Sequence, residues 1–175
     1  MKFFKYIIAG LFIGLTPALA QGVQDINGCT PTNLIDPPRI VYTCENGLVI
    51  EAEAMVEIEA IQPLQEGDAA TTPQLIQLNS NAVLISLPTG QGPFQIMTPH
   101  AIASVRGTTY VVDVTAEKTA VFVVEGVVAV AKDNNGISVD LKAGEGVTVS
   151  DQNPLLEVKT WPLEKVTGLM ARFAK

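Results

Sequence analysis

The sequence predicts an all-β fold: a single sandwich or roll of short, mostly antiparallel strands, followed by a short C-terminal helix. Short runs rich in β-branched residues recur at even spacing between residues 98 and 150, and residues typical of turns separate them. Of the 175 residues, 47% are hydrophobic and 17% are charged, which excludes a disordered chain. The formal net charge of −7 argues against a nucleic-acid partner, because phosphate binding needs a basic face.

Residues 1–20 have the features of a secretory signal peptide. Lys2 and Lys5 precede an apolar run at residues 6–15, and Ala18 and Ala20 supply the small side chains that a signal peptidase requires. The apolar run is shorter than the ~20 residues that cross a bilayer. We therefore expect cleavage after Ala20, a periplasmic or secreted mature chain, and no membrane span in that chain.

The mature chain is expected to hold one β-domain at residues 21–150 and a tail at residues 151–175. Its two cysteines, Cys29 and Cys44, are expected to pair in an oxidising compartment. Such a disulfide would stabilise the fold by about 3 kcal/mol. Two free buried thiols are the alternative, and a metal site is disfavoured because two cysteines and one distant histidine do not complete a tetrahedral ligand set.

A period of two at positions 50–60, with apolar residues at the even positions and glutamates with Met55 at the odd ones, predicts one strand with a buried face and a solvated face. The solvated face carries four carboxylates, those of Glu51, Glu53, Glu57 and Glu59. A calcium site on this row is disfavoured, because same-face neighbours on a strand stand about 6.8 Å apart.

The middle of the chain is predicted to contain a loop and a hairpin. Residues 62–74 include two prolines and a Gly-Asp pair, which is typical of a surface loop. The apolar runs at 75–78 and 82–87 flank Asn79-Ser80-Asn81, whose asparagines tolerate left-handed turn geometry, and this pattern predicts a hairpin. Two further strands are expected at 94–97 and 101–105.

Five more strands are expected in the C-terminal half of the β-domain, at residues 108–114, 120–124, 127–131, 137–141 and 146–149. The runs at 121–124 and 127–130 are apolar on both faces, so we expect them to be central and covered.

This half of the chain resembles the FecR domain family. The family pattern places a Thr-Pro segment first, then Arg-Gly-Thr-x-Phe/Tyr, then Leu/Val-Glu-Gly-x-Val, and last Leu-x-Ala-Gly-x-x-Val. The matching positions include Thr98, Pro99, Arg106, Gly107, Thr108, Tyr110, Glu125, Gly126, Ala143 and Gly144. The resemblance implies a FecR-like core at about residues 67–150, strongest at 98–149.

The motif residues are expected to be structural. Gly107, Gly126 and Gly144 suit turns that need positive φ. Arg106 is expected to pair with Asp113 or Glu125 at a partly buried position, with ligand binding as the alternative.

FecR-like regulators carry a cytoplasmic segment that binds a sigma factor, a transmembrane helix and a periplasmic β-domain that relays a signal. With a cleaved signal peptide, this chain would lack the cytoplasmic part. The resemblance therefore implies a free-standing exported module with an envelope protein as partner, acting as an interaction, sensor or accessory component. The alternative is a ligand-binding or structural envelope protein that holds glycan or peptide.

No catalytic constellation is recognisable in the sequence. His100 is the only histidine, and it follows a proline in a predicted turn, so a structural or solvated role is expected. There is no nucleophile elbow, phosphate-binding glycine loop or metal-ligand spacing. We expect a protein that is not an enzyme and has no cofactor.

The tail is predicted to form an amphipathic helix from Trp161 to Lys175, with Thr160 as its cap and Pro162 in its first turn. The apolar residues recur at helical spacing and form one face: Leu163, Val166, Leu169, Met170 and Phe173. This helix is expected to be a lid on one open end of the β-domain, a partner-docking element or a membrane-surface helix.

Overall fold

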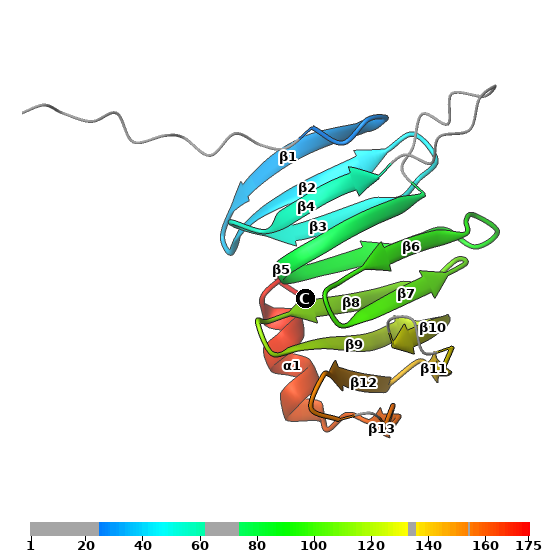
Figure 1. Ribbon diagram of the computed structural model, residues 1–175. Coiled ribbons are helices and arrows are strands. Elements are labelled where there is room, and N and C mark those ends of the chain that lie inside the picture. The colour runs from blue at the N-terminus through cyan, green and yellow to red at the C-terminus, as the bar shows by residue number, and fades with distance from the viewer. Residues whose placement is uncertain (1–24, 62–73, 133–135, 154) are drawn as a thin grey trace, which may run out of the picture.

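The computed structural model describes residues 25–61, 74–132, 136–153 and 155–175, and these form thirteen strands and one helix (Figure 1). The elements are β1 (Cys29–Ile35), β2 (Pro38–Cys44), β3 (Val49–Glu53), β4 (Glu57–Ile61), β5 (Leu75–Ser86), β6 (Phe94–Met97), β7 (Ala101–Val105), β8 (Thr109–Val114), β9 (Lys118–Glu125), β10 (Val127–Lys132), β11 (Ser138–Lys142), β12 (Glu145–Ser150), β13 (Lys159–Thr160) and α1 (Leu163–Ala171). The predicted all-β fold with a short C-terminal helix is confirmed. The predicted signal peptide and most of the predicted loop at 62–74 lie outside the described residues.

The strands form a curled sheet whose two halves share the long strand β5 (Figure 1). In the helix-side half, residues 81–86 of β5 pair with β3 and β8, and the order continues to β2 and β1 on one side and to β9, β12 and β13 on the other. In the opposite half, residues 75–80 of β5 pair with β4 and β6, followed by β7, β10 and β11. Only the β5–β6 pair is parallel among the described strands.

The main core lies between the two halves. Its largest fully buried side chains are Tyr42, Leu48, Ile50, Ile58, Ile76, Leu78, Ile85, Phe94, Ile96, Tyr110 and Leu141. Both halves contribute, so each half buries the inner face of the other. The helix α1 covers the outer face of the helix-side half, away from this core (Figure 1).

The predicted hairpin at 75–87 is wrong, because residues 75–86 form the single strand β5. Asn81 does adopt a left-handed conformation, with φ of 62°. It lies where β5 passes from its partners in one half to its partners in the other. The Asn-Ser-Asn segment therefore bends a continuous strand and does not reverse the chain.

The predicted single strand at 50–60 is also wrong, because it divides into β3 and β4 at Ala54, Met55 and Val56. Met55 has φ of 65°, and its carbonyl accepts a hydrogen bond of 3.0 Å from the Asn81 side chain. Since β3 and β4 pair with different parts of β5, the chain must turn where β5 bends.

The five strands predicted in the C-terminal half are confirmed as β8 to β12. Gly126 and Gly144 lie in the connecting turns with φ of 91° and 83°, which glycine adopts without strain. The expectation that 121–124 and 127–130 are fully covered is wrong at the β9–β10 turn, where Val124 and Val127 are exposed.

The Tyr110 hydroxyl is buried and has no hydrogen-bond partner among the described residues. Burial raises the pKa of Tyr110 far above its usual range. An unpaired buried hydroxyl costs about 1–3 kcal/mol. We expect Tyr110→Phe to raise the free energy of unfolding by about 1 kcal/mol, measured by urea denaturation. A loss of stability in this variant would contradict the structure, since it would mean that the hydroxyl has a stabilising partner.

Candidate functional site

A groove of about 740 Å³ opens between the β1–β2 hairpin and β4, and we call it the β2–β4 groove. Its volume falls within the range of about 300–1,000 Å³ that is typical of ligand sites. The lining residues are Asn33, Leu34, Pro38, Arg39, Ile40, Tyr42, Ala54, Met55, Val56, Glu57, Ile58, Glu59 and Asn79.

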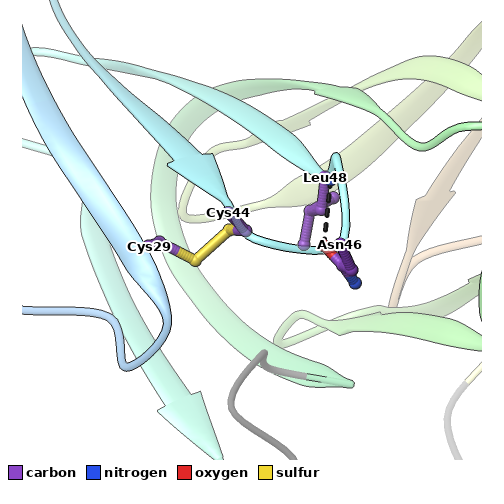
Figure 2. Close-up of a disulfide and its surroundings, with 4 residues drawn as sticks. All are labelled: Cys29, Cys44, Asn46 and Leu48. Carbon is purple, nitrogen blue, oxygen red and sulfur yellow. Dashed lines mark hydrogen bonds between the residues drawn. A yellow bond between two sulfur atoms is a disulfide. The ribbon is translucent and has the colours of Figure 1, made fainter.

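The hairpin wall of the groove is held by the disulfide between Cys29 and Cys44 (Figure 2). These cysteines lie directly opposite each other at the open end of the β1–β2 pair. Figure 2 also shows the turn that follows, where the Leu48 amide donates to the Asn46 side chain at 3.0 Å. The predicted disulfide is confirmed.

The floor of the groove on the hairpin side is apolar. Ile40 and Tyr42 both contact the main core, and Tyr42 is only 2% exposed. Burial, with a smaller contribution from Asp25, raises the pKa of Tyr42.

The other wall is the edge strand β4. Within the described residues β4 pairs with β5 alone, so its second edge is open. Ile58 is buried in the core, whereas Glu57 and Glu59 are exposed. This wall thus combines free backbone groups with two acidic side chains.

A second feature is the contact between the C-terminal segment and the outer face of the helix-side half. Leu169 and Phe173 pack against Ala82, Leu84 and Val111. The helix was predicted to cover an open end of the β-domain. In the structure α1 instead lies across a sheet face.

The C-terminal contact also includes ion pairs. Arg172 donates two hydrogen bonds of 2.6 Å to the Glu53 carboxylate and lies 2.8 Å from Asp113, while Lys175 lies 2.9 Å from Glu51. The hydrogen bonds to Glu53, and then those to Asp113, hold the pKa of Arg172 above its usual range. The expectation of a solvated row is therefore wrong for Glu51, which is 8% exposed, and for Glu53, which is half-buried.

Trp161 lies at the start of the C-terminal segment, where it is half-buried and contacts an aromatic and a cationic side chain. Phe122 stacks on the ring at a centroid distance of 5.1 Å, and the Lys165 ammonium lies 3.2 Å from the ring centroid. Burial, followed by the nearby Lys118, lowers the pKa of Lys165. These two contacts occupy ring surface on which a sugar would stack.

Gly146 lies beneath the Trp161 ring. A Cβ atom at this position would stand 2.5 Å from Nε1 and 2.8 Å from Cζ2 of Trp161. We expect Gly146→Ala to displace the ring, to cost about 1–3 kcal/mol as overpacking does, and to shift the emission of this single tryptophan to the red. Gly168→Ala is the control, because nothing lies within 4 Å of its Cβ position. An unshifted spectrum for Gly146→Ala would contradict the contact.

The family-motif residues lie around the turns of the β-domain. Arg106 is exposed and forms no ion pair within the described part of the chain, and Asp113 pairs instead with Arg172. The expected pairing of Arg106 with Asp113 or Glu125 is therefore wrong. The Thr108 hydroxyl donates to the Val127 carbonyl at 3.0 Å, which joins the start of β8 to β10.

Two further motif residues, Gly107 and Ala143, also lie in turns. A Cβ on Gly107, whose φ is 61°, would lie 2.6 Å from the Thr89 backbone. Ala143 is exposed beside Gly144 in the β11–β12 turn. These positions are not brought together with the β2–β4 groove.

His100 is buried, and its Nδ1 atom lies 3.2 Å from the Thr119 hydroxyl. That hydroxyl also donates to Thr98 at 2.9 Å, so the three side chains link the β6–β7 turn to β9. This is the arrangement of a structural histidine.

The predicted helix face is only partly buried. Leu169 and Phe173 are buried, Val166 and Met170 are half-buried, and Leu163 is 80% exposed. The predicted cap is wrong, because Thr160 belongs to β13 and Pro162 precedes the first helical residue without a side-chain capping bond. Leu163 is therefore not part of the contact.

Sequence reasoning missed Arg39, Tyr42 and Met55 as residues of the groove. The available signal was the apolar pair Leu34-Ile35 beside two prolines, which predicts an exposed hydrophobic turn. Where the structure describes the chain, no group of three or more potential metal ligands occurs, and no helix is long and apolar enough to cross a membrane.

Residues 48–129 match the protein family described as FecR protein. This stretch of the chain therefore resembles a FecR domain. The matched region includes β3 to β9 and the start of β10, so β4 lies inside it, whereas the β1–β2 hairpin precedes it. The match begins at residue 48, upstream of the core expected at 67–150. It ends at residue 129, before the expected end of that core.

Two crystal structures of a candidate anti-sigma factor from Parabacteroides distasonis are similar to this chain. The first has 20% sequence identity and a TM-score of 0.51, and the second has 19% and 0.49. Each alignment covers 85% of this chain and 63% of the other. At this identity the first structure shows a shared fold alone. A search of curated proteins finds no match.

Proposed function

We propose that the protein is an exported, non-enzymatic module that binds another protein in cell-envelope signalling, as a sensor or accessory component. The observation that carries this proposal is the match to the FecR family at residues 48–129. The fold shared with a candidate anti-sigma factor supports a regulatory role. The open β2–β4 groove supplies a surface that a protein partner could occupy.

The proposed export rests on the signal-like residues 1–20 and on the Cys29–Cys44 disulfide, since such bonds persist in oxidising compartments. Mass spectrometry of the protein from the envelope fraction is expected to find Gln21 at the N-terminus. An intact Met1 in that fraction would refute cleavage.

The second candidate is a periplasmic protein that binds glycan or peptide. The contacts of Phe122 and Lys165 with the Trp161 ring disfavour a sugar platform built on this ring. Peptide binding remains compatible with the groove and overlaps with the leading proposal.

The proposal is tested by cross-linking the tagged protein in intact cells and identifying the adducts. The matched control is the same tagged chain without residues 1–20, which is expected to stay in the cytoplasm. We expect a protein adduct only from the exported form. Recovery of glycan fragments without a protein adduct would support the second candidate and overturn the first.

A further inference from the structure

We propose that the β2–β4 groove binds an extended peptide segment of a partner protein, in which Lys or Arg alternates with apolar residues, and that this segment adds as a strand to the open edge of β4. The inference rests on the proposed function and names the chemistry of the partner. Three observations support it: the open backbone edge of β4, the apolar wall that faces it and the negative charge of the groove.

The backbone of β4 supplies the docking edge. Its five residues pair with β5 on one side, and within the described chain no strand occupies the other side. The groove lies between β4 and the hairpin, since its lining includes Met55 to Glu59 on one side and Pro38 to Ile40 with Tyr42 on the other. An open edge with a groove beside it is the arrangement in which peptides bind by strand addition, through main-chain hydrogen bonds.

The facing wall can receive apolar side chains. Alternation along β2 places Pro38, Ile40 and Tyr42 on one face, and the register places Ile35 opposite Pro38 on that same face. Ile35, at the hairpin tip beyond the groove lining, is 90% exposed, and Met55, at the β3–β4 turn within the lining, is 73% exposed. A partner strand with apolar residues at every second position would cover such surface.

The charge of the groove selects the partner. Glu57 and Glu59 are exposed and have no ion pair among the described residues. Arg39 is the one cationic residue of the lining, and its Nε atom already bonds Glu51 at 3.2 Å. The groove therefore presents a net negative charge, which is complementary to Lys or Arg.

The same carboxylates disfavour a second copy of this chain as the occupant. Pairing two β4 edges would bring like charges together across the new strand pair, which is destabilising. We therefore assign the groove to a basic partner strand.

The first experiment measures binding of a fluorescein-labelled decapeptide of alternating Lys and Val to the protein by fluorescence anisotropy. The control probe alternates Glu and Val. We expect saturable micromolar binding of the Lys-Val probe and none of the Glu-Val probe. Absence of binding of the Lys-Val probe would overturn the proposal, as would equal binding of both probes.

Strand addition is tested with two N-methylated forms of the Lys-Val probe, one methylated at the odd positions and one at the even positions. Each form lacks N–H donors along one edge. We expect one form to bind at least about tenfold more weakly than the other, because only one edge meets β4. Equal affinities would refute strand addition.

The site is tested with the double variant Glu57→Gln/Glu59→Gln. We expect binding of the Lys-Val probe to weaken about fivefold at low salt, since each exposed pair contributes modestly. The matched control is Glu125→Gln/Asp140→Asn, which removes two exposed carboxylates from β9 and β11. Equal weakening in both variants would place the binding elsewhere. A concentration-dependent dimer that the probe dissociates would make a second copy the occupant and overturn the assignment.

Failure of this inference is distinguishable from failure of the proposed function. If the Glu57→Gln/Glu59→Gln variant still forms a cross-link with an envelope protein, the proposed function is supported and the groove is refuted as the binding site. If the probe binds at the groove but no protein adduct forms in cells, the groove is supported as a peptide site and the proposed function is refuted.

Discussion

Phe173→Ala is expected to lower the free energy of unfolding by about 3 kcal/mol, as the removal of a buried phenylalanine side chain does. Phe173 is fully buried, and it packs with Leu169 against Ala82 and Leu84 on the outer face of the helix-side half. Its loss leaves a cavity between the C-terminal segment and the sheet. The measurement is urea denaturation followed by far-UV circular dichroism.

The control for Phe173→Ala is Leu163→Ala, in the first turn of the same helix. Leu163 is 80% exposed, so its truncation is expected to change stability by no more than about 0.5 kcal/mol. Equal stability of the wild type and Phe173→Ala would mean that the helix does not depend on this contact. That result would favour the docking-element interpretation of the tail.

Loss of the disulfide is expected to have an effect of similar size. Cys29→Ser/Cys44→Ser should lower the free energy of unfolding by about 3 kcal/mol, because the bond closes a segment of about fifteen residues in the unfolded chain. β1 pairs only with β2 in the described structure, so the hairpin wall of the groove should open first. Thermal unfolding and limited proteolysis of the hairpin measure the two effects.

Reductant provides the control for the disulfide prediction. It should lower the melting temperature of the wild type toward that of the double variant and leave the variant unchanged. A wild type that melts at the same temperature with and without reductant would contradict the prediction.

The strands from β8 to β12 could be predicted because their signals are local. Runs of β-branched residues and the turn glycines Gly126 and Gly144 specify strand and reversal within a few residues. The disulfide could also be predicted without tertiary information, because the chain holds only two cysteines. Both kinds of prediction need no knowledge of what lies across the fold.

The error at β5 shows the limit of local signals. Asn79-Ser80-Asn81 has the composition of a hairpin turn, yet a single left-handed residue at Asn81 can also bend a continuous strand. Which outcome occurs depends on the partners of β5, and those are β3, β4, β6 and β8. Local sequence contains no information on that choice.

The sequence by itself determined the strand content, the C-terminal helix and the row of carboxylates at 51–59. The tertiary structure alone decided that this row divides, with Glu51 and Glu53 paired to Lys175 and Arg172 and with Glu57 and Glu59 left exposed beside a groove. Arg172 and Glu53 are 119 positions apart. Alternation and turn chemistry act between neighbours in the chain, whereas ion pairs and open edges depend on which distant strands meet.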